Sequence, residues 1–243
     1  GHGRGGPGQL RAGFACQWCG DLLLAAAART LDRLPGLRVR VLEIDHRDSL
    51  AALRAGTVDV QLTELPVTDR DVVAGPVVLR DRRALAVPRG HRLAQRSETG
   101  VVQEDLAGER LITVGEPADS AAHTFHYPRH TPSGRPIGRG PAVATWQDAL
   151  VNVGAGRGVA PASMRAALYH ARPGVAYVPI IDAPPVQYAL LWLRGNDHVR
   201  MRGFARVVGE VAEAAEAAQA AEAAEAAQSA AAAAGPARQP TAA

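Results

Sequence analysis

Apolar residues recur with two different spacings over the first part of the chain. Leu10–Phe14 is a short apolar run, and Leu37, Val39 and Val41 alternate with arginines, which is the period of a β-strand. Between these runs, residues 21–34 form a Leu/Ala-rich stretch that stops before a Pro-Gly pair, as helices do. The pattern therefore predicts a strand, a helix from Asp21 to Leu34 and a second strand.

The alternation of predicted strands and helices continues up to about residue 62. Asp48 or Ser49 can cap a short helix through Leu53, because short polar side chains accept hydrogen bonds from the first helical N–H groups. The stretch "TVDVQL" then predicts a third strand. Strands that alternate with helices over short connections favour a parallel α/β sheet.

A second block of α/β pattern begins near residue 82. It contains a short turn and a strand in "VQEDLAGERLITV", a helix that ends in glycines in "TWQDALVNVGAGRG", and two strands in "GVAYVPII" and "VQYALLWLR". The intervening segment "HTFHYPRHTPSGRPIGRGP" is rich in Pro and Gly, so it predicts a loop rather than a regular helix.

The last forty residues combine a short amphipathic stretch with a low-complexity repeat. Phe204, Val207, Val208 and Val211 share one face of a predicted helix. The repeat "EAAEAAQAAEAAEAAQ" favours helix through its alanines but lacks large apolar residues for packing. We expect a solvated extension that adds little to the fold, followed by disorder in "GPARQPTAA".

Composition narrows the class of protein. All 27 basic residues are arginine, and the net charge is only +3. Because no arginine-rich stripe with interleaved aromatics appears, direct nucleic-acid binding by this chain is not indicated. No secretory signal and no apolar run of membrane-spanning length is present, so we expect a soluble, cytoplasmic protein.

The two cysteines of the chain, Cys16 and Cys19, stand in the stretch "GFACQWCGD" between the first strand and the first helix. A C-x-x-C at a helix start suits a ligand-binding loop, a redox pair or part of a metal site. Two thiols are too few ligands for structural zinc, and no second C-x-x-C exists. A binding loop is the favoured interpretation, with thiol redox chemistry as the alternative and Cys19 expected to be buried.

Other candidate chemistry is sparse. His123, His126 and His130 lie close enough in sequence to bind a metal if they share a helix, but the expected loop makes this unfavourable. "GAGRG" follows a helix rather than a strand, so it lacks the context of a dinucleotide-binding loop. We predict no catalysis, no metal and no cofactor.

The order of these segments resembles one family, the effector-binding domain of LysR-type transcriptional regulators. The resemblance is carried by "LRAGF", "LPGLRVRVLEIDHRDSLAALRAGTVDVQL", "LAVPRGHRLA", "DLAGERLITV", "ALVNVGAGRGVAPAS" and "GVAYVPIIDAPPVQYALLWLRG", in the correct order over residues 9–211. It implies an α/β fold like the type 2 periplasmic binding proteins, with two Rossmann-like lobes joined by two crossover strands.

The resemblance also implies a division of the chain. Residues 1–8 would be a flexible linker or cloning remnant, and 212–243 the Ala/Glu-rich tail. The first lobe would comprise 9–81 and 185–211, and the second lobe 82–184. The family's helix-turn-helix is not found in this sequence, so DNA is expected as a partner only through a domain outside this chain.

By the same resemblance, an effector lies in the cleft between the lobes. The family's contact positions fall on Ala15, Cys16, Gln17, His46, Thr63, Ser120 and Trp146. Trp18, placed in the first loop, and Trp146 are expected to approach from opposite lobes, and Glu64 would repel an anionic effector unless an arginine pairs with it.

The function implied is effector sensing, transmitted through rearrangement of a dimer or tetramer. The partners are a small molecule and further copies of the chain, with no membrane. Two alternatives remain: a solute-binding protein of a transporter, and a thiol-based redox protein that uses Cys16 and Cys19.

Overall fold

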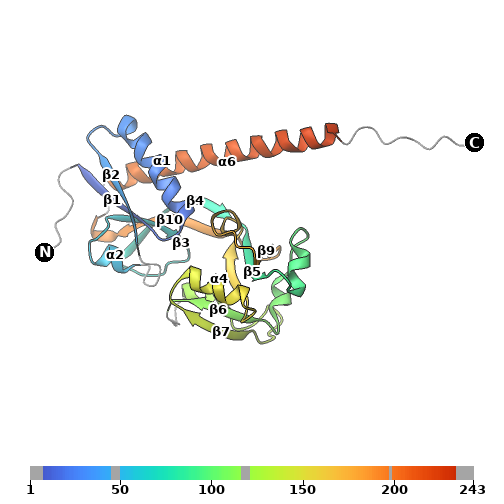
Figure 1. The fold of residues 1–243 in the computed structure, drawn as a ribbon. Helices are drawn as coiled ribbons and strands as arrows, with labels where there is room; N and C mark the ends of the chain where they lie inside the picture. Colours follow the sequence, from blue (N-terminus) through green and yellow to red (C-terminus); the bar gives the residue numbers. More distant parts are fainter. Residues whose placement is uncertain (1–7, 45–49, 116–120, 197–198, 234–243) are drawn as a thin grey trace, which may run out of the picture.

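The computed structural model describes residues 8–44, 50–115, 121–196 and 199–233, arranged in two lobes (Figure 1). The first lobe is built on a five-stranded sheet of order β2-β1-β3-β10-β4. Its strands are β1 (Gln9–Phe14), β2 (Arg38–Glu43), β3 (Val60–Glu64), β4 (Val72–Asp81) and β10 (Val186–Leu193).

The direction of pairing changes within this sheet. β1 pairs in parallel with β2 and β3, as the sequence predicts. β10 pairs antiparallel with both β3 and β4, two pairings that the prediction for the first three strands did not cover. The reason is topological: β4 and β10 lead out of and back into the lobe, and neither follows a crossover helix within it.

The second lobe holds two smaller sheets. They are β8 (Ala160–Ser163), β5 (Arg83–Pro88) and β9 (Val175–Pro179) in one, and β6 (Arg110–Val114) and β7 (Gly138–Val143) in the other. The chain passes between the lobes twice, from β4 into β5 and from β9 into β10. The resulting α/β fold is the one expected, whereas the exact residue boundaries of the lobes stay a prediction.

Helices cover the sheets. The α-helices are α1 (Gln17–Arg33), α2 (Ala51–Arg54), α3 (Ala121–His126), α4 (Trp146–Gly154), α5 (Ala166–Tyr169) and α6 (Val199–Ala233). Short 3-10 helices occupy η1 (Arg92–Arg96), η2 (Gln103–Leu106) and η3 (Arg194–Asn196). Within the described residues, none of these helices is both long enough and apolar enough to cross a membrane.

Helix α1 anchors the first lobe and begins earlier than predicted. Its buried side includes Trp18, Cys19 and Leu23, and it packs against α6 and β2. The helix starts at Gln17 rather than Asp21 because Cys16 adopts an extended backbone and serves as the N-cap. Cys16 makes no side-chain capping hydrogen bond, so the usual Ser, Thr, Asp or Asn signal is missing from the sequence.

Helix α3 stands where the sequence predicted only a loop. It ends at His126, two residues before Pro128, as proline requires. Pro128 therefore limited the length of this helix without preventing it, and the expectation of no regular helix there was wrong.

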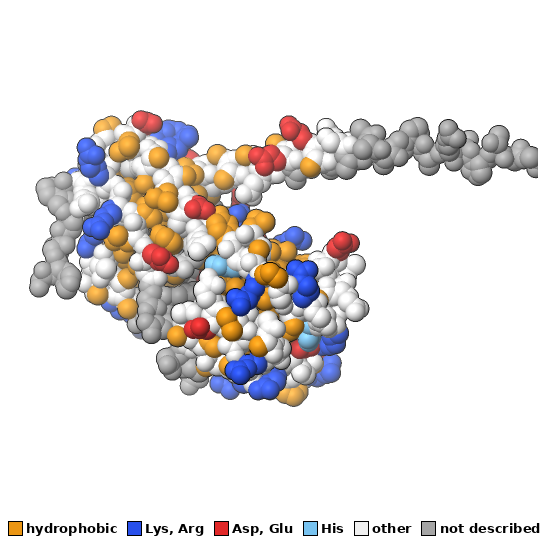
Figure 2. All heavy atoms as spheres, viewed as in Figure 1, with side chains coloured by type: hydrophobic (Ala, Val, Ile, Leu, Met, Phe, Trp, Pro, Cys, Tyr) orange, Lys and Arg blue, Asp and Glu red, His pale blue; other side chains and the backbone are white. Residues whose placement is uncertain are grey.

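Helix α6 has two different halves. Phe204, Val207 and Val208 are buried against the first lobe, as the apolar spacing predicts, and Val211 of the same face is half-buried and packs against the same core. From Glu213 to Glu222 the side chains are exposed, and the helix projects away from both lobes (Figures 1 and 2). The Ala/Glu repeat is thus helical, with solvent-exposed side chains over residues 213–222, while the predicted disordered end lies outside the described residues.

Candidate functional site

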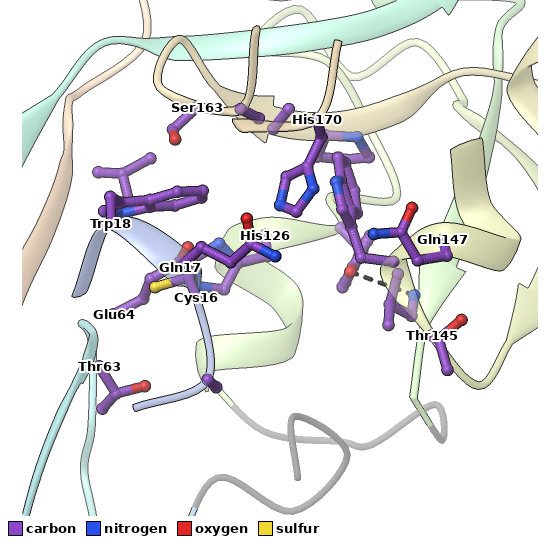
Figure 3. Close-up of a pocket in the computed structure, with 18 of the residues that line it drawn as sticks. Cys16, Gln17, Trp18, Thr63, Glu64, His126, Thr145, Gln147, Ser163 and His170 are labelled. Carbon is purple, nitrogen blue, oxygen red and sulfur yellow. Dashed lines mark hydrogen bonds and ion pairs between the residues drawn. The ribbon is translucent and has the colours of Figure 1, made fainter. Parts of the chain in front are cut away.

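A cavity of about 590 Å³ lies between the two lobes, within the range typical of small-molecule sites. Residues of both lobes line it (Figure 3). In that view Cys16, Gln17, Trp18, Thr63 and Glu64 form one side, Thr145 and Gln147 form the other, and His170 lies between them.

The first-lobe wall is formed where parallel strands end. Ala15 and Cys16 follow β1, and Thr63 lies near the end of β3 beside it. The carboxyl ends of parallel strands meet at one edge of a sheet, which brings these side chains together. Gly20 lets α1 start close to β1, because a Cβ there would lie 2.8 Å from the ring of Phe14.

The two thiols occupy the first turn of α1. Their sulfur atoms lie 3.0 Å apart, and neither is in a disulfide. Cys16 lines the cavity and is half-buried, whereas Cys19 is fully buried beneath it. Burial, with the hydrogen bond to Cys16 as a smaller cause, raises the pKa of the Cys19 thiol well above its ordinary value.

The second-lobe wall is the start of α4. Thr145 caps this helix, its Oγ1 accepting from the N–H of Asp148 at 3.1 Å. The T-x-x-D spacing that produces this cap fixes where the helix begins. Trp146 and Gln147 follow in the first turn and line the cavity.

Three aromatic rings form a connected group at the cavity. The imidazole of His170 lies 6.2 Å from the ring of Trp18 and 6.2 Å from the ring of Trp146, in edge-on arrangements. Trp18 belongs to the first lobe, and the other two belong to the second. Burial lowers the pKa of His170, which favours the neutral ring at this position.

Two polar side-chain contacts also connect the lobes, one between Glu64 and His126 and one between Asp21 and Tyr169. The Glu64 carboxylate accepts from the hydroxyl of Tyr188 at 3.1 Å and lies 3.3 Å from Nε2 of His126 in the second lobe. Outside the cavity, the Tyr169 hydroxyl donates to Asp21 at 2.7 Å. Glu64 therefore already has a histidine and a tyrosine as contacts, and its charge also acts on Arg83.

Arg83 is a buried cation in the cavity wall. Its side chain is 8% exposed, and its Nη2 has no hydrogen-bond partner among the described residues. The guanidinium stacks on Phe125, 4.4 Å from the ring centroid. Burial lowers the pKa of Arg83, while the charge of Glu64 partly offsets this effect.

Five of the predicted site residues come together in this cavity. Ala15, Cys16, Gln17, Thr63 and Trp146 all line it. His46 and Ser120 lie outside the described residues. That the five residues bind an effector stays a prediction. Trp18 also lines the cavity, but it lies on α1 rather than in the loop where we placed it.

Sequence reasoning missed several lining residues, among them Arg83, His126, Tyr127, Thr145, Gln147, Ser163 and His170. Thr145 has a readable signal in its capping spacing, and Arg83 is the first residue of the otherwise apolar strand β5. His126 was considered only as a metal ligand. The structure separates it from His123, because His126 faces Glu64 while His123 packs 4.9 Å from the ring of Tyr127.

No group of three or more metal-ligating side chains occurs among the residues that the structure describes. The motif "GAGRG" begins with the last residue of α4, in the helix-then-glycine order predicted, and is not among the residues that line the cavity.

Comparison with known proteins assigns the chain to one family. The model of the LysR substrate binding domain family matches residues 3–213. The HTH-type transcriptional regulator ShiR of Corynebacterium glutamicum (strain R) is 26% identical over 194 residues, covering 79% of this chain and 64% of that protein. The HTH-type transcriptional regulator IlvR of Caulobacter vibrioides is 26% identical over 223 residues, covering 85% of this chain and 69% of that protein.

This chain thus spans about two thirds of the length of these regulators. Among solved structures, the BenM effector binding domain with its effector benzoate has the same fold, with a TM-score of 0.63 at 20% identity. The likeness covers 84% of this chain and 91% of that one.

Proposed function

Since the chain belongs to the LysR substrate binding domain family, we propose that its inter-lobe cavity binds the small-molecule effector of a transcriptional regulator. The family consists of regulatory domains and not of enzymes. The observation that carries the proposal is the cavity itself, because both lobes line it and a ligand bound there would contact both. A ligand that contacts both lobes favours the closed arrangement over an open one.

We propose further that the effector is a small organic anion, most simply a carboxylate. Buried charges in proteins are normally paired, because an isolated ion loses its hydration. Arg83 is buried, and its Nη2 is unpartnered, while Glu64 already has Tyr188 and His126. A carboxylate beside Arg83 would supply the missing acceptor, and a guanidinium suits that group geometrically.

The first turn of α1 would assist an anion. The leading N–H groups of a helix have no partner within the helix and favour negative charge. Cys16 provides no side-chain cap, and the first turn contains no acidic residue that would compete. Glu43, on the rim of the cavity, is exposed to solvent, and its charge is therefore screened more strongly than that of Arg83.

The aromatic rings indicate the rest of the ligand. Trp18, His170 and Trp146 offer apolar faces and edges around one space. Planar rings pack well against such surfaces. We therefore propose a ring-containing carboxylate, held by charge at one end and by ring packing at the other.

Binding assays with acids and their neutral analogues test this proposal. A series of monocyclic carboxylates that starts with benzoate is compared with the matched primary amides by thermal shift and calorimetry. Acids should bind and their amides should bind much less. Arg83→Gln should weaken acid binding by about 13- to 160-fold, which corresponds to roughly 1.5–3 kcal/mol for a charged hydrogen bond.

Arg82→Gln serves as the matched control, because the side chain of Arg82 is exposed and is not part of the cavity wall. Its affinity for the acid should equal that of the parent. If Arg83→Gln folds normally and binds the acid as tightly as the parent does, Arg83 is not the counter-charge. If amides and acids bind equally, the ligand is not an anion.

Transmission would pass through α1. Its first turn lines the cavity, and its outer face exposes Leu24 and Leu31, which are 58% and 59% exposed. The helix is about 25 Å long, so a shift at its first turn moves a rigid element. We propose that this face pairs with a second copy of the chain, and that DNA binding belongs to a helix-turn-helix domain in a longer protein.

A further inference from the structure

Cys16 and Cys19 have the placement of a reactive dithiol. Cys16 is the N-cap of α1, and Cys19 is its third residue, with the N–H of Cys19 donating to the Cys16 carbonyl at 3.0 Å. This backbone turn holds the two sulfurs 3.0 Å apart, and both thiols are free. A C-x-x-C in the first turn of a helix is a setting in which dithiols and disulfides interconvert readily.

The two thiols differ in access. Cys16 is half-buried and lines the cavity, so a small reagent can reach it. Cys19 has 0% exposure, and burial raises its pKa. Cys16 is therefore suited to the first attack on an external reagent, and Cys19 is suited only to react with its neighbour.

A bound metal ion explains the close placement of Cys16 and Cys19 less well. Zinc–sulfur bonds of about 2.3 Å in a tetrahedral site hold two sulfurs about 3.8 Å apart, farther than the separation here. Zinc also needs further ligands, and the described residues contain no group of three or more metal-ligating side chains. The pair thus has too few partners for a structural ion.

We infer that Cys16 and Cys19 form a reversible thiol–disulfide couple in the wall of the cavity, oxidised by a low-molecular-weight disulfide. The Cys16 thiolate attacks one sulfur of the small disulfide, whose S–S bond breaks. One small thiol leaves with a proton, and a mixed disulfide remains on Cys16. Cys19 then loses its proton and attacks the Cys16 sulfur, which releases the second small thiol.

The overall change is balanced. Two protein thiols lose two electrons and two protons, and one small disulfide becomes two small thiols. Oxidation also alters the cavity, because the Cys16 sulfur bonds to Cys19 and no longer offers an S–H group to a ligand. Trp18 lies between the two cysteines in sequence and packs on His170, so its surroundings change as well.

Equilibration of the full chain in glutathione redox buffers tests the inference. After acid quenching and alkylation of the unfolded protein, intact mass distinguishes the dithiol, the mixed disulfide and the internal disulfide. The parent should pass from dithiol to internal disulfide in one transition that dithiothreitol reverses. Tryptophan fluorescence should follow the same transition.

Variants that lack one cysteine test whether Cys16 is the attacking thiol and Cys19 the thiol that closes the disulfide. Cys19→Ser should stop with one glutathione on Cys16, and Cys16→Ser should gain none, because Cys19 is buried. A parent that stays reduced, stops at the mixed disulfide or forms disulfides between chains would overturn the inference. So would modification of Cys16→Ser together with an inert Cys19→Ser. The assay contains no effector, so its outcome is independent of whether the cavity binds carboxylates.

Discussion

Glu64 in the first lobe faces His126 in the second, with 3.3 Å between the carboxylate Oε2 and the imidazole Nε2. Glu64 ends β3 and His126 ends α3, so this contact joins the last residues of two elements across the cavity. Asp21 and Tyr169 make a second connection between the lobes. The lobes therefore hold one another in the described arrangement through polar contacts as well as through the two connections of the chain.

A double-mutant cycle measures the contact between Glu64 and His126. Glu64→Gln replaces the carboxylate and His126→Gln replaces the imidazole. The double variant should be more stable than the sum of the two single losses in stability predicts. The side chains are 30% and 20% exposed, so we expect a coupling of about 0.5–1 kcal/mol in urea unfolding under mildly acidic conditions. A cycle of Glu64→Gln with Arg82→Gln is the control and should be additive. Additivity in the first cycle as well would show that the contact between Glu64 and His126 contributes nothing to stability.

Intrinsic fluorescence should report ligand binding. Trp18 and Trp146 line the cavity and contact His170, while Trp192 is buried on β10 and is not among the lining residues. A ring carboxylate should therefore change the emission, and Trp192→Phe should retain that change. Loss of the signal in Trp192→Phe, with Trp18 and Trp146 intact, would place the responding site elsewhere.

Loss of one neutral polar contact should weaken binding moderately. Gln17 is exposed at the first turn of α1 and offers both donors and an acceptor to a ligand. Gln17→Ala should weaken binding by about two- to twelvefold, equivalent to roughly 0.5–1.5 kcal/mol. Trp146→Ala should cost more for a planar ligand, because ring packing and cavity shape are lost together. Titration of the fluorescence change gives both values, and unchanged affinity in both variants contradicts the assignment.

Deletion of residues 215–243 should leave the fold intact. Among the described side chains of α6, Ala212 is the last that is buried, and those from Glu213 to Glu222 face solvent. Removal of exposed Ala and Glu side chains uncovers little apolar area, so the melting temperature and the oligomer size should change little. A fall of several degrees would mean that the projecting half packs against something, most simply another copy of the chain.

The outer face of α1 should control self-association. Leu24→Glu together with Leu31→Glu would place charges on a surface that we propose to be buried between subunits, at a cost of desolvation. Arg29→Glu on the same helix is a second probe. Sedimentation should shift toward the monomer. Leu168→Glu is the control, since Leu168 is 79% exposed on α5 in the other lobe. Identical sedimentation of the parent and the α1 variants would identify that face as solvent surface.

The stability of the protein should depend on the protonation of His170. Burial lowers the pKa of His170 below its ordinary 6.5, so the unfolded chain binds the proton more readily between the two values. The free energy of unfolding should therefore rise with pH through that window and be lowest below it. His170→Gln should flatten this dependence in urea unfolding between about pH 5 and pH 8. His130→Gln, at an exposed position, is the control and should show the same pH dependence of the unfolding free energy as the parent. Equal slopes in the parent, His170→Gln and His130→Gln would refute a contribution of His170.

Much of the fold was predictable because its signals are local. β1, β2 and β3 follow from alternation and short apolar runs, and the amphipathic start of α6 follows from the spacing of Phe204, Val207 and Val208. Such periods reflect which side of one element faces the core, and they need no knowledge of distant residues. The order of these elements also placed Cys16 and Thr63 at the ends of adjacent parallel strands, and hence in one cavity.

Local pattern was insufficient wherever an element depended on its surroundings. Helix α1 begins at Gln17 without a recognisable cap, because Gly20 can pack against Phe14 and Cys19 can be buried. Helix α3 forms in a segment whose prolines and glycines suggested a loop. In both cases tertiary contacts outweighed weak local preferences.

The sequence by itself determined the alternation of strands and helices, and with it which strand ends meet at one edge of the first sheet. Only the tertiary structure decided the charges and rings of the cavity: that Glu64 meets His126 and Tyr188, that His170 lies between Trp18 and Trp146, and that Arg83 is buried without an acid bonded to its Nη2. These residues are far apart along the chain. Their proximity depends on how two lobes pack across a shared cleft, and no local period of hydrophobic and polar residues encodes that packing.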